Sequence, residues 1–110
     1  NNEWSEQNAR ENFALNGVSG NIALYLGELD AVPAAQYDLI VANMQLPIIT
    51  TLLPAFAAML EGPDARLITS GILAVNRDDL ARSAHAVGLV ASEERQEDEW
   101  IATLFEPIGE

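Results

Sequence analysis

The chain has no cysteine, no lysine and a single histidine among its 110 residues. Without cysteine it can form no disulfide, no thiolate metal site and no cysteine nucleophile. No apolar run approaches the ~18 residues that a membrane-spanning helix needs, and the first residues have neither the basic start nor the apolar core of a signal peptide. These absences favour a soluble, cytoplasmic protein without a membrane partner.

The lone histidine and the paired acids also limit the possible chemistry. His85 lies in a segment, 80–88, whose spacing predicts a helix, so we expect an ordinary helix residue and no Ser-His-Asp site. The neighbouring acids Asp78-Asp79 and Glu93-Glu94 would point in different directions in a helix or a strand. We therefore expect no metal site.

Basic residues are scarce. The chain has 17 acidic residues and only five arginines, which gives a formal net charge of -12. Such a surface repels phosphate backbones, so we do not expect this chain to bind nucleic acid directly. A basic protein partner would be attracted. Adaptation to high salt explains the same excess of carboxylates, and the sequence does not separate the two explanations.

What is present is an alternation of helical and strand patterns along one domain, 1–110. The patterns predict that Asn76 caps a helix ending at Gly88 and that Gly71 turns the chain. Pro54 is expected to kink the preceding helix, unless the helix restarts at this proline. Helices are expected over 4–16 and 47–60, strands over 21–26, 37–42 and 65–69, and an antiparallel hairpin over 89–94 and 100–105. The fold class is therefore α/β.

The strand pattern at 37–43, Tyr-Asp-Leu-Ile-Val-Ala-Asn, ends an unbroken apolar run on Asn43. In open α/β sheets, ligands bind beyond the carboxyl ends of parallel strands, where an amide can hold a cofactor or a substrate nitrogen. The alternative is local, because Asn is also a common turn and N-cap residue and Pro47 marks a helix start nearby. Both interpretations remain open on spacing alone.

Four segments in order resemble class I S-adenosylmethionine-dependent methyltransferases of the bacterial PrmA type, which methylate a large-subunit ribosomal protein. The segment 37–44 resembles the fourth motif of that family, and 67–73, Leu-Ile-Thr-Ser-Gly-Ile-Leu, resembles its fifth strand and the turn beyond. The segment 9–18 resembles the helix after its second strand, and 97–102 the start of its last strand. The resemblance implies a Rossmann-like sheet with helices on both faces and a C-terminal antiparallel hairpin.

The resemblance also implies roles for two residues, Asn43 and Glu28, and the position of Ser70 makes it a third, weaker candidate. Asn43 matches the residue between the cofactor and the amine to be methylated, and Glu28 matches an acidic position near the adenine ring. Ser70 lies at a strand end in the same layer and would line the substrate site. The bland alternatives are a solvated loop acid for Glu28 and a turn serine for Ser70. Trp100 would cover part of the site or belong to the core.

The family's glycine-rich cofactor turn and its ribose-binding acid have no counterpart here. No Gly-x-Gly-x-Gly pattern occurs, and the match places the acid just upstream of Asn1. The chain therefore resembles a partial domain that lacks the cofactor-binding half. We expect S-adenosylmethionine and a basic ribosomal protein to bind the complete parent, and the isolated chain to be inactive. The alternative is a non-catalytic α/β interaction module or an inert fragment.

The family's strand order carries an expectation about assembly. Two strands that this chain lacks would separate segment 21–26 from segment 37–42. Their loss would leave the apolar strand 37–42 as an exposed edge, which invites pairing with another chain. Either segment 21–26 closes against this edge within one molecule, or two molecules pair their exposed edges. The connection after segment 21–26 is also short for a parallel crossover. The sequence therefore favours a homodimer formed through exposed sheet edges.

Overall fold

The computed structural model describes residues 22–26, 37–60 and 62–108. The expected helix over 4–16 and the candidate residue Glu28 lie outside this part of the chain. The described strands are β1 (Ile22–Leu26), β2 (Leu39–Asn43), β3 (Arg66–Leu73), β4 (Leu89–Glu97) and β5 (Trp100–Pro107). The described helices are α2 (Leu46–Met59), the 3₁₀ turn η1 (Ala74–Asn76) and α3 (Arg77–Ala86).

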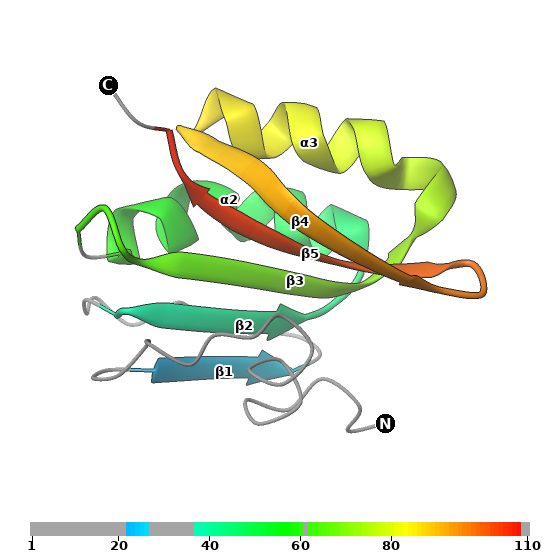
Figure 1. Ribbon diagram of the computed structural model, residues 1–110, viewed down its shortest axis with the longest axis horizontal. Helices are drawn as coiled ribbons and strands as arrows, with labels where there is room; N and C mark the ends of the chain where they lie inside the picture. Colours follow the sequence, from blue (N-terminus) through cyan, green and yellow to red (C-terminus); the bar gives the residue numbers. More distant parts are fainter. Residues whose placement is uncertain (1–21, 27–36, 61, 109–110) are drawn as a thin grey trace.

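The five strands form one sheet in the order β1-β2-β3-β5-β4 (Figure 1). The first three run parallel, whereas β5 is antiparallel to both of its neighbours, β3 and β4. A parallel α/β sheet that ends in an antiparallel hairpin was predicted from the sequence and is confirmed. The hairpin is longer than predicted, because its pairing extends from Leu89 opposite Pro107 to Glu97 opposite Trp100.

Strand β2 is buried in the sheet, as its unbroken apolar run predicts. Its first four residues, from Leu39 to Ala42, have no exposed surface. Ile40 and Ala42 belong to a core cluster that includes apolar side chains of both α2 and α3, so the two helices pack on the same face of the sheet. Leu39 and Val41 alternate to the opposite face and are equally buried.

Helix α2 is continuous through Pro54, so the predicted alternative of a restart at this proline is wrong. Pro47 lies in its first turn, where a missing backbone N–H costs nothing. Its buried residues recur at helical spacing and press one stripe against the sheet: Ile49, Leu53, Phe56 and Met59. This packing holds the helix together across an exposed proline whose ring removes one backbone hydrogen bond.

Strand β3 runs through Gly71 to Leu73, and the prediction that Gly71 turns the chain is wrong. Thr69 pairs with Thr103 and Ile72 with Ile101, so three steps along β3 match two steps along β5. One extra residue is inserted, which is a β-bulge. Gly71 has a φ of 82°, a backbone conformation that glycine adopts without strain. The glycine bends the strand locally without ending it.

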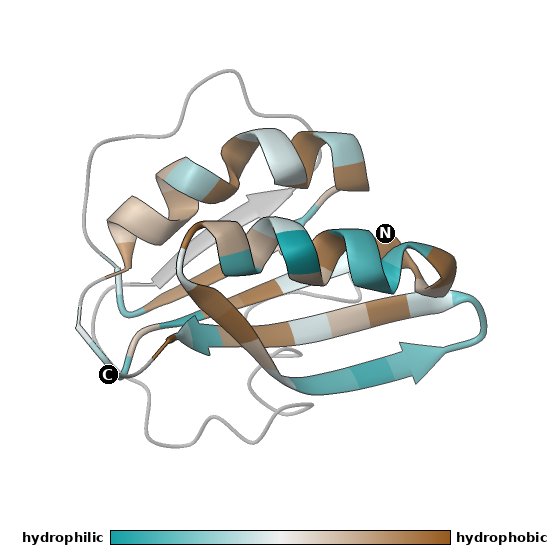
Figure 2. Ribbon diagram, turned by 90° about the horizontal axis from the view of Figure 1, so that it is seen from above, coloured by the Kyte–Doolittle hydropathy of each residue, from teal (hydrophilic) through white to brown (hydrophobic). Residues whose placement is uncertain are grey.

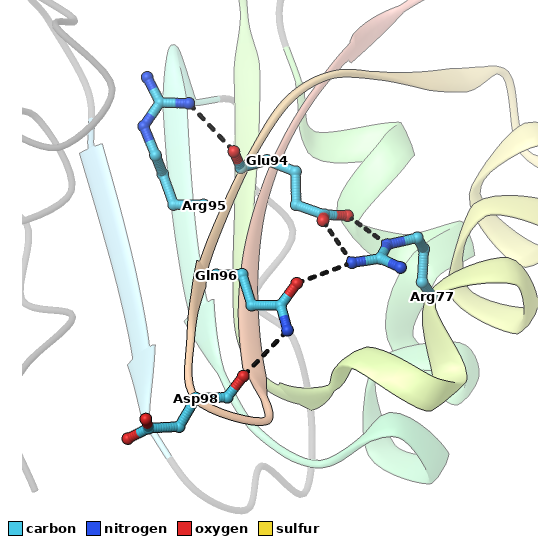
Figure 3. A network of polar contacts seen from close by, with 5 residues as sticks. All are labelled: Arg77, Glu94, Arg95, Gln96 and Asp98. Carbon is cyan, nitrogen blue, oxygen red and sulfur yellow. Dashed lines mark hydrogen bonds and ion pairs between the residues drawn. The ribbon is translucent and has the colours of Figure 1, made fainter.

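Helix α3 begins differently from the sequence prediction. Asn76 is the N-cap residue of α3, but its side chain makes no capping hydrogen bond. It is also the last residue of η1, which continues directly into α3 at Arg77. The Arg77 side chain donates two hydrogen bonds to the Glu94 carboxylate of β4, of 2.8 and 2.6 Å, and a third to the Gln96 side chain at 3.1 Å (Figure 3). The hydrogen bond to Glu94, more than its charge, raises the pKa of Arg77 above the ordinary arginine value. The contact ties α3 to the hairpin.

The outer strand β4 changes character along its length. It starts with apolar residues and becomes hydrophilic toward the hairpin turn (Figure 2). Arg95 pairs with Glu93 across 2.9 Å on this strand. Charged residues on an edge strand discourage pairing with other chains, so this side of the sheet is protected against aggregation.

Strand β1 lies directly beside β2, with Ile22 opposite Leu39 and Leu26 opposite Asn43. The expectation that β2 would remain an open edge is therefore wrong. The backbone groups of a buried strand need partners, and β1 supplies them within the same chain. In the described ranges, neither helix is long and apolar enough to span a membrane.

Candidate functional site

The candidate site lies where the parallel strands β2 and β3 reach the carboxyl side of the sheet. Asn43 is the last residue of β2 and is half-buried. It pairs with Ser70 of β3, and the next residue, Met44, donates its backbone N–H to the Ser70 carbonyl at 3.2 Å. Paired residues on adjacent strands point to the same face, so the amide of Asn43 and the hydroxyl of Ser70 are neighbours on the face opposite α2 and α3.

The local alternative for Asn43 does not hold. The N-cap of α2 is Gln45, two residues further along the chain, and the helix begins at Leu46. Asn43 is still part of the strand ladder, paired with Leu26 on one side and Ser70 on the other. Its side chain is therefore not used to cap the helix, which was the competing explanation for an amide at this position.

The bulge in β3 brings the backbone of Gly71 close to the side chain of Asn43. A methyl group placed on Gly71 would lie 2.7 Å from Oδ1 of Asn43, nearer than side-chain carbons approach such atoms. The Met44 backbone oxygen and nitrogen would lie at ordinary contact distances of 3.5 and 3.6 Å. The amide of Asn43 thus occupies space that exists because residue 71 is glycine.

Two successive hydroxyl residues of β3 are buried, and no described residue forms a hydrogen bond with their hydroxyl groups. Ser70 and Thr69 have no exposed surface, and neither Ser70 Oγ nor Thr69 Oγ1 has a hydrogen-bond partner among the described residues. Successive strand residues face opposite ways, so Ser70 shares the face of Asn43 whereas Thr69 faces the helices. Burial of an unpaired hydroxyl costs free energy, typically about 1 to 3 kcal/mol. The Ser70 hydroxyl therefore has donor and acceptor capacity, on the face of Asn43, that no described residue uses.

The structure brings Asn43 and Ser70 together, as the sequence predicted, but does not test Glu28. Trp100 opens β5 opposite Leu73 and is 48% exposed, so it is not a fully buried core residue. His85 lies near the end of α3 with an exposed side chain, four residues before β4 begins. Within the described ranges, no three acidic, histidine or cysteine residues come together in a way that could hold a metal ion.

Sequence reasoning missed the part played by Gly71. A glycine after an apolar strand indicates a turn in most contexts, and the sequence predicts one at Gly71 for this reason. The signal that it belonged to a bulge was the continuation of the apolar pattern in Ile72 and Leu73. The pairing partner β5, which follows β3 by more than 25 residues, decides between the two interpretations.

Comparisons with known proteins assign the chain to a family. Residues 2–106 match the family "Ribosomal protein L11 methyltransferase (PrmA)". Similar proteins include the ribosomal protein L11 methyltransferase of Symbiobacterium thermophilum, which is 36% identical over 96 residues, 87% of this chain and 31% of that protein. The enzyme of the same name from Chlorobaculum tepidum is 32% identical over 110 residues, 97% of this chain and 37% of that protein.

Solved structures show the same fold. A ribosomal protein L11 methylase from Lactobacillus delbrueckii subsp. bulgaricus superposes with a TM-score of 0.68 at 23% identity and covers 96% of this chain and 56% of that chain. A putative methyltransferase from Thermoplasma acidophilum has a TM-score of 0.55 at 13% identity and covers 73% of this chain and 42% of that chain. The chain spans about a third of the length of the curated relatives that it matches. It belongs to the ribosomal protein L11 methyltransferase (PrmA) family.

Proposed function

We propose that this chain is one portion of an S-adenosylmethionine-dependent protein methyltransferase that methylates amines of a ribosomal protein. The observation that carries the proposal is the placement of Asn43. In a chain of this family, its amide lies half-buried at the carboxyl end of β2 and does not cap the helix, and it neighbours the Ser70 hydroxyl, which no described residue pairs with. This is the edge of a parallel sheet where ligands bind.

Asn43 would act by positioning. Its Oδ1 can accept a hydrogen bond from an amine N–H and thereby turn the nitrogen lone pair toward the methyl group. An amide takes up no proton near neutral pH, so Asn43 holds the neutral amine and does not act as its base. The Ser70 hydroxyl is suited to a second contact on the same face. When bound, the cofactor supplies a sulfonium methyl group that is already a strong donor.

The residues present fit the acceptor side of such a site better than the cofactor side. The space beside Gly71 accommodates the Asn43 amide, and Glu28 is proposed to contact the adenine ring. The sequence contains no Gly-x-Gly-x-Gly turn to carry the methionine part of the cofactor. We therefore propose that residues 1–110 are a single partial domain that is inactive in isolation and lacks the N-terminal glycine-rich half.

Cofactor affinity tests the idea of a partial domain. Each missing contact to a charged group typically removes about 1.5 to 3 kcal/mol of binding free energy. Calorimetric titration of the 110-residue chain with S-adenosylmethionine is therefore expected to show millimolar or undetectable binding. Micromolar affinity of this chain alone would show that it carries a complete cofactor site.

The proposed partner is a basic protein. With 17 acidic residues and five arginines, the chain attracts lysine-rich surfaces and repels nucleic acid. A second candidate function remains, because the chain spans only about a third of its curated relatives. It would be a non-catalytic α/β interaction module or an inert fragment that keeps the sheet and performs no chemistry.

The decisive experiment uses the full-length protein that contains this chain, with a recombinant ribosomal protein as methyl acceptor. Asn43→Ala is expected to lower kcat by about a hundredfold, as loss of a positioning group does, with little change in thermal stability. The matched control is Gln45→Ala, two residues on, whose exposed side chain makes no capping bond. Wild-type turnover in Asn43→Ala would remove the proposed role of this amide. Absence of methyl transfer by the full-length protein would favour the non-catalytic module.

A further inference from the structure

Three glycines of the described chain have similar positive φ values, and they differ in what surrounds them. Gly62, Gly71 and Gly88 have φ values of 84°, 82° and 86°. A methyl group added at Gly62 or Gly88 would meet no atom within 4 Å, whereas at Gly71 it would meet Asn43 Oδ1 at 2.7 Å. Positive φ explains a glycine at all three positions. The close approach to a candidate site residue is peculiar to Gly71.

The obstacle at Gly71 is a movable group. The backbone atoms of Met44 lie at ordinary contact distances from the added methyl group, so the backbone does not forbid it. The colliding atom is the end of the Asn43 side chain, which can turn about its side-chain bonds. A methyl group at residue 71 would therefore displace the amide more than it would disturb the sheet.

We infer that Gly71 is a positioning residue for the methyl-transfer reaction: the bulge that it forms in β3 leaves the space that sets the orientation of the Asn43 amide. The inference rests on the proposed function of Asn43 and extends it to a residue that acts through the Asn43 side chain. The backbone of the bulge also places Ser70 opposite Asn43, since the Ser70 carbonyl accepts the Met44 N–H at 3.2 Å. One bulge thus arranges both side chains of the candidate site.

The test compares, in the full-length protein, two alanine substitutions at glycines with similar positive φ values. Gly71→Ala and Gly88→Ala both force alanine to a φ above 80°, so both lower the melting temperature through strain. Displacing a positioning group by about 1 Å can cost up to a hundredfold in rate. We expect Gly71→Ala to lower kcat at least about tenfold with KM for the cofactor unchanged, and Gly88→Ala to keep kcat within about twofold of wild type. Equal kcat values for the two variants would overturn the inference.

A double variant shows whether Gly71 acts through Asn43. In an Asn43→Ala background the colliding oxygen is absent, so adding Gly71→Ala is expected to change kcat by less than about twofold. If Gly71→Ala alone fails to fold, the same double variant is expected to fold as well as Gly88→Ala. A full additional loss of kcat, or of folding, in the double variant would contradict the inference.

A spectroscopic signal separates this inference from the proposed function. With ¹⁵N-labelled asparagine, the side-chain NH₂ resonance of Asn43 is assigned by its loss in Asn43→Ala. It is expected to shift in Gly71→Ala and to stay unchanged in Gly88→Ala, whether or not Asn43 matters for turnover. Normal turnover in Asn43→Ala with a shifted resonance would refute the function and keep the positioning. An unshifted resonance in Gly71→Ala would refute the positioning.

Discussion

Thr69 places a hydroxyl group in the interior of the sheet on the face covered by the helices. It has no exposed surface, and its Oγ1 has no hydrogen-bond partner among the described residues. Valine has nearly the same shape and replaces the hydroxyl by a methyl group, which removes the cost of burying an unpaired polar atom. Thr69→Val is therefore expected to raise the free energy of unfolding by about 1 kcal/mol in urea denaturation.

The same substitution at Thr51 serves as the control. Its hydroxyl is exposed and donates to the Pro47 carbonyl at 2.9 Å, so Thr51→Val removes a hydrogen bond and relieves no burial. We expect no gain in stability there. A loss of stability in Thr69→Val would mean that its hydroxyl finds a hydrogen-bond partner in the folded protein.

Among individual residues, the sequence patterns indicate Asn43 and Ser70 as candidate site residues, whereas the turn that they predict at Gly71 is wrong. Asn43 was detectable because it interrupts an apolar run at a strand end, and Ser70 because it follows another such run. Both facts are local. The role of Gly71 depends on the distance to Asn43, a residue 28 positions earlier, and no local pattern reports such a distance.

Among the elements, the hairpin of β4 and β5 has one turn residue in a left-handed backbone conformation. Its two-residue turn is Asp98-Glu99, and Asp98 has a φ of 56°, whereas Glu99 is not among the described residues with positive φ. Turns with positive φ at the first central position prefer glycine there. Asp98→Gly is expected to raise the free energy of unfolding by about 0.5 to 1 kcal/mol, because it relieves left-handed strain at the cost of some chain entropy.

Glu99→Gly is the matched control for the turn. It adds the same chain entropy at the neighbouring position without strain to relieve, so the free energy of unfolding is expected to fall. The backbone carbonyl of Asp98 that accepts a hydrogen bond from Gln96 at 2.9 Å is present in both variants. A less stable Asp98→Gly in thermal unfolding would show that the aspartate side chain stabilises this turn.

Element boundaries show where local patterns suffice. Helix α2 and the starts of both hairpin strands follow their sequence patterns, because the helix buries one regular stripe and each hairpin strand pairs with its immediate neighbour. The start of α3 and the end of β3 do not follow. Contacts with β5 extend β3 beyond Gly71, and η1 takes the place of a capped start at Asn76. Tertiary contacts overrule local preferences in both cases.

In the whole molecule, the position of β1 decides the expected assembly. Because β1 occupies the edge of β2, that edge is no longer open to a second copy. We expect light scattering to give a monomeric mass for the 110-residue chain up to high micromolar concentration. A dimeric mass would instead support the homodimer predicted from the sequence, with β2 pairing between molecules.

The sequence by itself determined the α/β class, the antiparallel hairpin, the buried character of β2 and the candidate residues Asn43 and Ser70. These features follow from residue periodicity, from apolar runs and from polar residues at their ends, all of which are properties of short segments. The tertiary structure alone decided that β1 lies beside β2, that β3 continues through a bulge and that Gly71 approaches the Asn43 amide. Each of these depends on which distant segment supplies the hydrogen-bond partners of a strand. That choice is made by the whole sheet, since every buried backbone group must be paired.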